Sequence, residues 1–296
     1  MKIRGAFALF ALAFALVFGF ADNAHADEPS MPGPDVDAGL NPGTMRPLWE
    51  LGLGVAGLRL PDYIGSDESG SYLLPLPYIV YRGTFLKADR DGARALLFST
   101  QRVKVDVSVA GSTPARSSGN TARRGMPDLA GTLELGPNLN VTLANSQKNR
   151  WKIDLRLPLR AAVSIERSPD FIGTTFSPNI NLDLGGVAGG WNLGLQTGPV
   201  FSDRKFHRYY YGVDAAYATP GRPAYAARGG YAGWRAVAAT SRRFGNMWVG
   251  GFVRYNNLDG AAFEDSPLVR RTSGVTFGVG VSWVLATSSE LVAASD

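Results

Sequence analysis

The chain has 296 residues, a formal net charge of +5 and no cysteine, which excludes a disulfide-stapled scaffold and a cysteine zinc site. Its basic residues do not cluster with interleaved aromatic residues, so the sequence argues against a nucleic-acid partner. Glycine accounts for 36 residues, well above average usage, and so much glycine disfavours a helical protein.

Residues 1–26 have the three parts of a secretory signal. Lys2 and Arg4 precede an apolar run from Ala6 to Ala21, and Ala24-His25-Ala26 forms a small-x-small cleavage site. A retained membrane anchor is the alternative, but the run is shorter than the roughly 20 residues of a spanning helix. We expect cleavage after Ala26, followed by a flexible lead rich in proline, glycine and aspartate at residues 27–45.

Apolar and polar residues then alternate along much of residues 46–285. In the segment WKIDLRLPLRAAV (151–163), every odd position is apolar or small. The even positions up to 160 carry Lys152, Asp154, Arg156, Pro158 and Arg160. The same alternation marks residues 49–55, 102–111, 177–186 and 275–283. Since successive side chains on a strand point to opposite faces, these segments predict strands with one apolar and one polar face.

Two architectures accommodate such strands. In a soluble sandwich the apolar face forms the core, whereas in a membrane barrel it meets lipid and the polar face lines the interior. Trp49, Trp151 and Trp283 end apolar faces, as residues of an interfacial aromatic girdle do. We predict an all-β fold, an antiparallel transmembrane β-barrel of about 12–14 strands at residues 46–285, with a tail at 286–296. The charged residues predicted to face the lumen are Lys104, Asp106, Lys152, Asp154, Arg156 and Asp183.

The predicted connections alternate in length. Long ones are expected near residues 61–71, 111–128, 214–225 and 258–273, and short ones at 82–83, 99–102, 136–138 and 242–246. Hairpin parity places the long connections together, on the outer side of an outer-membrane barrel, and the short ones on the periplasmic side. Two long connections carry opposite charges. We expect exposed pairs between them over the barrel mouth, each worth under about 1 kcal/mol, between Arg116, Arg123 or Arg124 and Asp259, Glu264 or Asp265.

Candidate catalytic chemistry is sparse. His25 belongs to the predicted signal, so His207 is the only histidine of the mature chain, and a Ser-His-Asp hydrolase would need it. A structural histidine beside the following tyrosines is the alternative. Asp62, Asp67 and Glu68 would suit calcium, but their spacing is not that of an EF-hand loop, and a solvated acidic loop explains them as well. We predict no catalytic, cofactor or metal site.

Other polar residues of the long connections are interpreted as contacts that order the loops. These residues are Asp62, Tyr63, Arg124, Asp128, Asp265 and Ser266. They lie in or beside six segments: LPDYIGSDES (60–69), PLPYIVYRG (75–83), RRGMPDLAGTLELGP (123–137), RYYYGV (208–213), ARGGYAGW (227–234) and VRYNNLDGAAFEDSPLVRR (253–271).

In this order the six segments resemble the MipA/OmpV family of bacterial outer-membrane proteins, the MltA-interacting proteins. The resemblance implies a non-enzymatic scaffold in the cell outer membrane that links a murein-cleaving lytic transglycosylase to a murein synthase. Its other partner would be outer-membrane lipid. One departure is the tail after Trp283, because barrels of this kind usually end on an aromatic residue.

Three functions remain open at this stage. The first is the scaffold that the resemblance implies. The second is a narrow outer-membrane pore or small-solute binder, which the alternating lumen charges would suit, although the same charges would also fill a barrel as ion pairs. The third is a barrel hydrolase that depends on His207.

Overall fold

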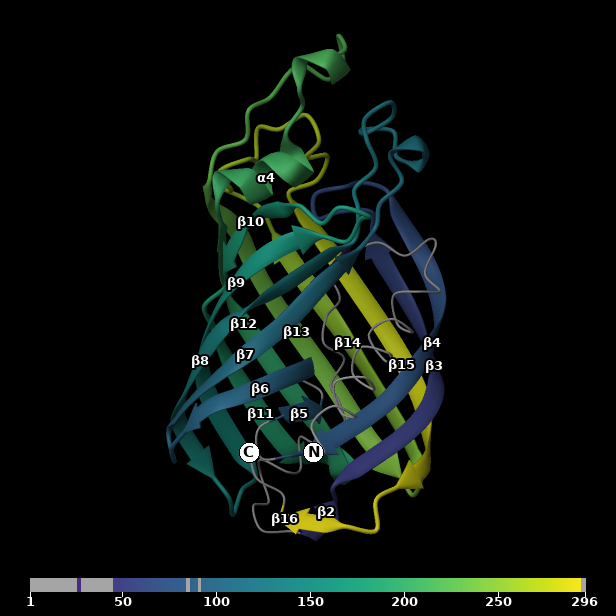
Figure 1. The fold of residues 1–296 in the computed structure, drawn as a ribbon, viewed down its shortest axis with the longest axis vertical. Helices are drawn as coiled ribbons and strands as arrows, with labels where there is room; N and C mark the ends of the chain where they lie inside the picture. The colour runs from purple at the N-terminus through teal and green to yellow at the C-terminus, as the bar shows by residue number, and fades with distance from the viewer. Residues whose placement is uncertain (1–25, 28–44, 84–85, 90–91, 294–296) are drawn as a thin grey trace.

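A computed structural model describes residues 26–27, 45–83, 86–89 and 92–293. The predicted signal and flexible lead lie outside the described residues, except for Ala26, Asp27 and Met45. The described chain consists mainly of strands (Figure 1). No helix in the described part of the chain is long and apolar enough to cross a membrane.

Fourteen strands form one antiparallel sheet. They are β1 (Ala26–Asp27), β3 (Trp49–Pro61), β4 (Ser69–Arg82), β5 (Leu86–Asp89), β6 (Gly92–Ser99), β7 (Val103–Thr113), β8 (Thr132–Ser146), β9 (Trp151–Ser164), β10 (Phe171–Phe176), β11 (Asn179–Gly186), β12 (Trp191–Ser202), β13 (Gly230–Phe244), β14 (Met247–Asn257) and β15 (Ser273–Thr287). A separate ribbon pairs β2 (Met45–Pro47) with β16 (Leu291–Ala293). The longest described helix is α4 (Arg204–Tyr211).

The strand pairings run in a ring. Each strand from β3 to β9 pairs with the next, β10 and β11 both bridge β9 to β12, and β12 to β15 continue in sequence. β15 then pairs with β3, which gives the β-barrel of Figure 1. β1 pairs only with the end of β7 and is not part of the ring, and β10 and β11 share one position between β9 and β12. The described ring therefore has 12 positions. Among the described residues β4 pairs with β5 only at Tyr81 and Arg82. The pairing of β10 with β12 is as short, but there β11 also pairs with β12.

Strand β9 shows the two faces of the wall. Asp154, Pro158 and Ala162 are buried, whereas Leu159 is 49% exposed. On other strands, Leu73 and Val279 are exposed in the same way. Large apolar patches are rare on soluble proteins and are the rule on the lipid-facing band of a transmembrane barrel. The predicted antiparallel barrel with an apolar outer face is confirmed.

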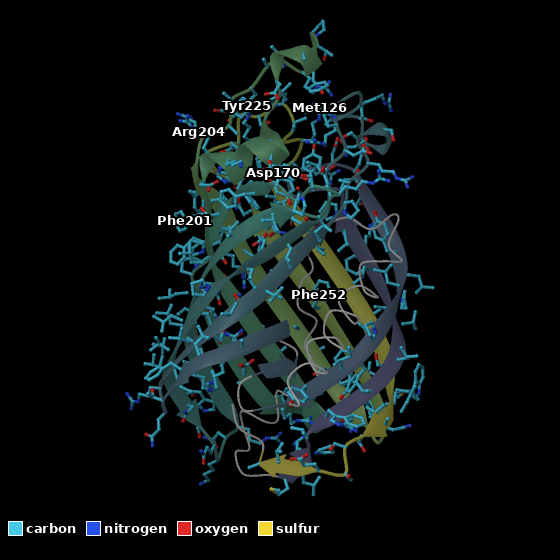
Figure 2. All side chains as sticks on the ribbon, viewed as in Figure 1. Met126, Asp170, Phe201, Arg204, Tyr225 and Phe252 are labelled. Carbon is cyan, nitrogen blue, oxygen red and sulfur yellow. The ribbon has the colours of Figure 1, made fainter. Side chains whose placement is uncertain are left out.

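Aromatic residues gather near both ends of this outer face. At one end, the rings of Trp191 and Phe244 meet edge to face with centroids 6.2 Å apart. At the other end, Phe201 stacks on Phe176 and also meets Tyr231 at 5.8 Å. Phe201 lies at the outer margin of the barrel in Figure 2. Such belts are typical of the two interfaces of a membrane.

The long and the short connections lie at opposite ends of the barrel, as predicted. We call one end the cap end, because it holds the long connections 62–68, 114–131, 165–170, 203–229 and 258–272. The opposite, ribbon end holds the β2–β16 ribbon and the short turns 100–102, 147–150, 187–190 and 245–246 (Figure 1).

One predicted turn is wrong. Residues 136–138 lie inside β8, where Pro137 pairs with Val107 of β7. A side chain on Gly136 would collide with the carbonyl oxygen of Leu159 on β9. The glycine therefore permits close approach of two strands, although Gly-Pro in a sequence commonly indicates a turn.

Candidate functional site: the loop cap

The connections at the cap end pack on one another around a hydrophobic core of their own. Its buried residues are Tyr63, Ala115, Leu129, Tyr211, Val213, Ala227, Leu258, Ala261, Phe263 and Leu268. They come from four different connections, and the rings of Tyr211 and Phe263 stack with centroids 3.7 Å apart. Figure 2 places Met126 and Tyr225, which pack against this core, above the strands. The cap is therefore a packed unit rather than a set of independent loops.

Helix α4 is fixed at its first turn by Asp203. One carboxylate oxygen accepts a hydrogen bond from the backbone N–H of Phe206 at 2.8 Å, which is an N-cap. The other accepts bonds from the backbone N–H and hydroxyl of Thr174 on β10, both at 2.8 Å. Burial raises the pKa of Asp203, but these hydrogen bonds outweigh it and hold the pKa below the usual value. The same carboxylate thus starts the helix and ties it to the barrel wall.

The tyrosines of α4 reach three neighbouring segments. Tyr211 donates its hydroxyl to the carbonyl of Ile64 at 2.9 Å, and Tyr209 donates to the carbonyl of Ala130 at 3.2 Å. The hydroxyl of Tyr210 lies 3.2 Å from that of Ser112 at the end of β7. Burial raises the pKa of Tyr209 to about 12, so its hydroxyl stays protonated and remains a donor.

Asn120 joins the connection 114–131 to the connection 62–68. Its side-chain amide donates to the carboxylate of Asp62 at 2.8 Å and to the hydroxyl of Ser66 at 3.1 Å. Its side-chain oxygen accepts from the backbone N–H of Arg123 at 3.1 Å. Asn120 is 1% exposed, so these bonds satisfy a buried amide.

Two buried arginines link further segments by donating to carbonyl groups. Arg123 donates to the carbonyl of Tyr210 at 3.0 Å and to the hydroxyl of Ser117 at 3.2 Å. Burial lowers the pKa of Arg123 from its usual value. Arg222 donates to the carbonyl oxygens of Tyr217, Ala122 and Arg124. A planar guanidinium with five N–H groups is suited to holding several carbonyls at once.

The connection 258–272 closes the cap. Tyr63 donates its hydroxyl to the carbonyl of Leu268 at 2.6 Å, and Ser266 donates to the carbonyl of Tyr211 at 2.7 Å. The carbonyl of Gly65 accepts from the backbone N–H groups of Arg270 and Arg271. Gly65 has a φ of 97°, a conformation that favours glycine.

Four of the six loop residues chosen from the sequence make cap contacts. Asp62, Tyr63 and Ser266 are described above, and Asp128 accepts from the backbone N–H of Ser117 at 2.7 Å. The side chains of Arg124 and Asp265 lie on the exposed surface. Asn120 and Arg222 also make cap contacts, but they are isolated polar residues without a pattern in the sequence to mark them.

The expected pairing of arginines with acids over the mouth is wrong for Arg123, which donates to carbonyl and hydroxyl groups instead. Glu264 accepts from the backbone N–H of Gly260, four residues before it. Arg123 donates to backbone carbonyls and not to acidic side chains because each loop carbonyl that loses its water inside the cap needs another hydrogen-bond donor.

His207 lies inside the cap and is fully buried. Its Nδ1 is 2.6 Å from the carbonyl oxygen of Arg228, and its ring packs edge to face on Phe263 with centroids 4.6 Å apart. Burial lowers the pKa of His207, so the ring is neutral at pH 7. These contacts hold α4 against Arg228, at the end of the same connection, and against the connection 258–272.

The residues predicted to line the lumen begin with Lys104 and Asp106 on β7. Asp106 is 3% exposed and accepts hydrogen bonds from the side-chain amides of Asn138 and Asn140 on β8. Lys104 is opposite Asn140 in the strand register, on the same face as Asp106.

The remaining four predicted lumen residues lie on β9 and β11. Lys152 forms an ion pair with Asp154 at 3.2 Å, and Asp154 also accepts a hydrogen bond from Thr142 at 2.8 Å. Arg156 lies 3.9 Å from Asp183. Together with Asp106, these residues make one side of the inner wall polar.

The opposite side of the inner wall is apolar near the ribbon end. Tyr78, Val80, Trp248 and Val284 form a buried cluster. Beside it, Glu50 is 1% exposed and accepts from Arg82 at 2.8 Å and from Arg243. Packed and paired side chains therefore cover this part of the inner wall at the ribbon end.

Within residues 26–27, 45–83, 86–89 and 92–293, no three His, Cys, Asp or Glu side chains are placed to hold a metal ion. Asp62 and Glu68, considered above for calcium, accept hydrogen bonds from Asn120 and from the backbone N–H of Thr121. The cap is chemically suited to holding loops together and presenting a fixed surface.

The apolar outer face, the paired aromatic belts and the sidedness of the loops define a transmembrane β-barrel of the outer-membrane class. The family model described as "MltA-interacting protein MipA" matches residues 53–285, and the chain belongs to this family. A solved structure titled "Bacterial polysaccharide outer membrane secretin" is similar at 7% identity and a TM-score of 0.40, covering 80% of this chain and 99% of that one. A comparison with curated proteins found no match.

Proposed function

We propose that this chain spans the bacterial outer membrane, with the cap outside and the ribbon end in the periplasm, as a non-enzymatic scaffold for a lytic transglycosylase of the MltA type and a murein synthase. The family match over residues 53–285 carries this proposal, because the family is named for interaction with MltA. Residues 1–26 would direct export and be removed, and residues 27–45 would form a lead to the barrel.

The orientation follows the rule that outer-membrane barrels have short periplasmic turns and long outer loops. Murein enzymes act in the periplasm, so the partner surface would be the ribbon end. The segments that resemble the family supply much of the cap, where Tyr63, Tyr211 and Ser266 bind neighbouring loops. Their role in the cap's own packing supports assigning the partner surface to the opposite end.

The test is retention of a purified MltA-type transglycosylase by the detergent-solubilised chain. We expect retention by the wild type, loss in a variant lacking residues 288–296, which removes β16, and normal retention by Asn120→Ala in the cap. A wild-type chain that folds but retains neither that enzyme nor a murein synthase would contradict the scaffold.

A small-solute binder or narrow pore is the second candidate, favoured by the polar inner wall around Asp106 and Asp154. The packed side chains at both ends favour a barrel that does not conduct. Single-channel recording of the same sample distinguishes a pore from a scaffold. Steady conductance by the wild type would make the pore the favoured function.

A further inference from the structure

A glycine-rich segment at the ribbon end, residues 185–190, comprises the last two residues of β11 and the turn to β12, and has two arginines against it. A side-chain carbon on Gly186 would lie 2.6 Å from Nη1 of Arg150, and one on Gly189 would lie 3.6 Å from Nη1 of Arg242. Gly186 and Gly189 have φ values of 67° and 84°, which favour glycine. Two guanidinium groups therefore approach one turn closely because Gly186 and Gly189 lack side chains.

This turn lies at the level of the aromatic belt. The guanidinium of Arg242 is 4.5 Å from the ring centroid of Phe244, which in turn meets Trp191, the first residue of β12. Aromatic belts mark the depth of lipid headgroups. The three segments that meet here, 146–152, 185–192 and 240–247, contain five basic residues and no acidic residue. Two of the five, Lys152 and Arg243, pair with Asp154 and Glu50 on the inner wall. An anionic group at headgroup depth would be attracted to this position.

An apolar groove lies on the same outer face, farther along the strands. It has a volume of about 390 Å³ and is almost wholly apolar. Ala236 and Ala238 leave space on β13, and the larger side chains of Leu195, Val253 and Tyr255 border that space. A groove of this kind in the lipid-facing band is shaped to hold a hydrocarbon chain.

The turn and the groove are spaced as the two parts of one lipid. Residues 195–197 of β12, at the groove, lie four to six residues beyond Trp191. At about 3.4 Å per residue and a tilt of about 45°, that is about 10–15 Å deeper in the membrane. Half of the hydrocarbon core is about 15 Å, so an acyl chain that starts at the turn would reach the groove.

From these observations we infer that the outer face of β11–β14 holds one phospholipid of the periplasmic leaflet with a net negative headgroup. Its phosphate lies against Arg150 and Arg242, where guanidinium groups suit phosphate oxygens, and one acyl chain lies over Ala236 and Ala238. The inference rests on the membrane orientation proposed above and adds a lipid ligand to it.

The experiment is native mass spectrometry of the chain reconstituted in mixed micelles with phosphatidylglycerol or phosphatidylcholine. We expect one retained phosphatidylglycerol per wild-type chain and little phosphatidylcholine. The double variant Arg150→Gln/Arg242→Gln should bind phosphatidylglycerol about tenfold less tightly, which corresponds to about 1.4 kcal/mol. Ala238→Leu, which fills the groove without changing charge, should also lower retention. Arg102→Gln, an exposed arginine in another turn of the same end, is the matched control and should bind like the wild type.

Folding is checked in every sample by heat-modifiable gel mobility. A folded wild type that retains no phosphatidylglycerol, or retains it equally in the double variant, overturns the lipid site and leaves the membrane orientation standing. Retention of phosphatidylcholine at the same level also overturns it. A chain that folds and stays soluble without detergent contradicts the membrane placement and the lipid site together.

Discussion

The side-chain amide of Asn120 lies 2.8 Å from the carboxylate of Asp62, and this bond joins two connections that are 58 residues apart in the chain. Asn120→Ala would leave Asp62 and Ser66 without this donor inside the cap. We expect a loss of about 1–3 kcal/mol in the local stability of the connection 114–131, with the barrel strands unchanged. Hydrogen exchange of residues 114–131 measures it. Arg124→Ala in the same connection removes an exposed side chain and should leave exchange unchanged.

Val279 lies on the outer face of β15 and is 65% exposed. Val279→Arg would place a charge in the apolar band at a cost of about 2–4 kcal/mol near the membrane midplane. Urea-dependent folding into lipid vesicles should show this destabilisation. Leu291→Arg is the matched control, because Leu291 is also exposed but lies on the β2–β16 ribbon. Equal effects of the two substitutions would argue against a lipid-facing wall.

The orientation is tested by epitope tags in two connections at opposite ends. A tag after Ser118, in the cap, should be detected on intact cells. A tag after Asn149, in the turn 147–150, should require permeabilised cells. Asn138, which lies within β8, is unsuitable for this purpose. The reverse labelling would place the cap in the periplasm, where its surface would be available to murein enzymes.

The cap should lose stability in mild acid because of His207. Burial lowers its pKa in the folded cap below the ordinary 6.5, so the unfolded chain binds more protons below about pH 6.5. The stabilisation by neutral His207 is complete above pH 6.5 and is lost as pH falls through 6.5 towards the folded pKa. Exchange of the α4 amides, corrected for intrinsic rate, should therefore show less protection at pH 5.5 than at pH 7.5.

His207→Gln keeps a donor for the Arg228 carbonyl but cannot titrate, so it should remove that difference between pH 7.5 and 5.5. Asp203 also has a lowered pKa, and its contribution is lost only at a lower pH, below its ordinary 3.8. An unchanged pH dependence in His207→Gln would show that another group is responsible.

Glu50 binds two arginines at the ribbon end. Glu50→Gln would remove the carboxylate from Arg82, whose side chain is 8% exposed, and from the more exposed Arg243. Breaking a buried ion pair on one side costs up to about 3–5 kcal/mol, and we expect a lower midpoint of urea unfolding. Glu290→Gln, an exposed acid in the same end, should have little effect.

The strands could be predicted because apolar and polar residues alternate, with a period of two, along the segments that form the barrel wall. Residues 151–163 alternate so regularly that the faces of β9 follow from the order of its side chains. The exception at residues 136–138 has a local cause. Gly136 and Pro137 are turn-forming residues, and the close approach of β9 to Gly136 is a tertiary contact that a single strand does not reveal.

The cap could be predicted only in part, because its contacts join residues that are far apart. The hydroxyl of Tyr63 binds the carbonyl of Leu268, 205 residues later. Tyr63 and Ser266 could be chosen as loop-ordering residues from their place in the long connections. Nothing in the sequence says that Arg222 reaches the carbonyl of Ala122, 100 residues before it. Every residue has a backbone carbonyl, so a side chain that donates to one has no complementary residue type that could be recognised in the sequence.

The sparse pairing of β4 with β5 has a consequence for how the barrel comes apart. β4 pairs with β3 along its length, but within the described part of the chain, which leaves out residues 84–85 and 90–91, it pairs with β5 only at Tyr81 and Arg82. Pro75 and Pro77 lie on β4, and proline is tolerated on a strand edge that needs no N–H donor. Fewer backbone bonds cross this line than cross β8–β9, which pair from Thr132 to Ser146. Under heat or lateral tension the wall should therefore tear first between β4 and β5, with the β8–β9 hairpin among the last parts to separate.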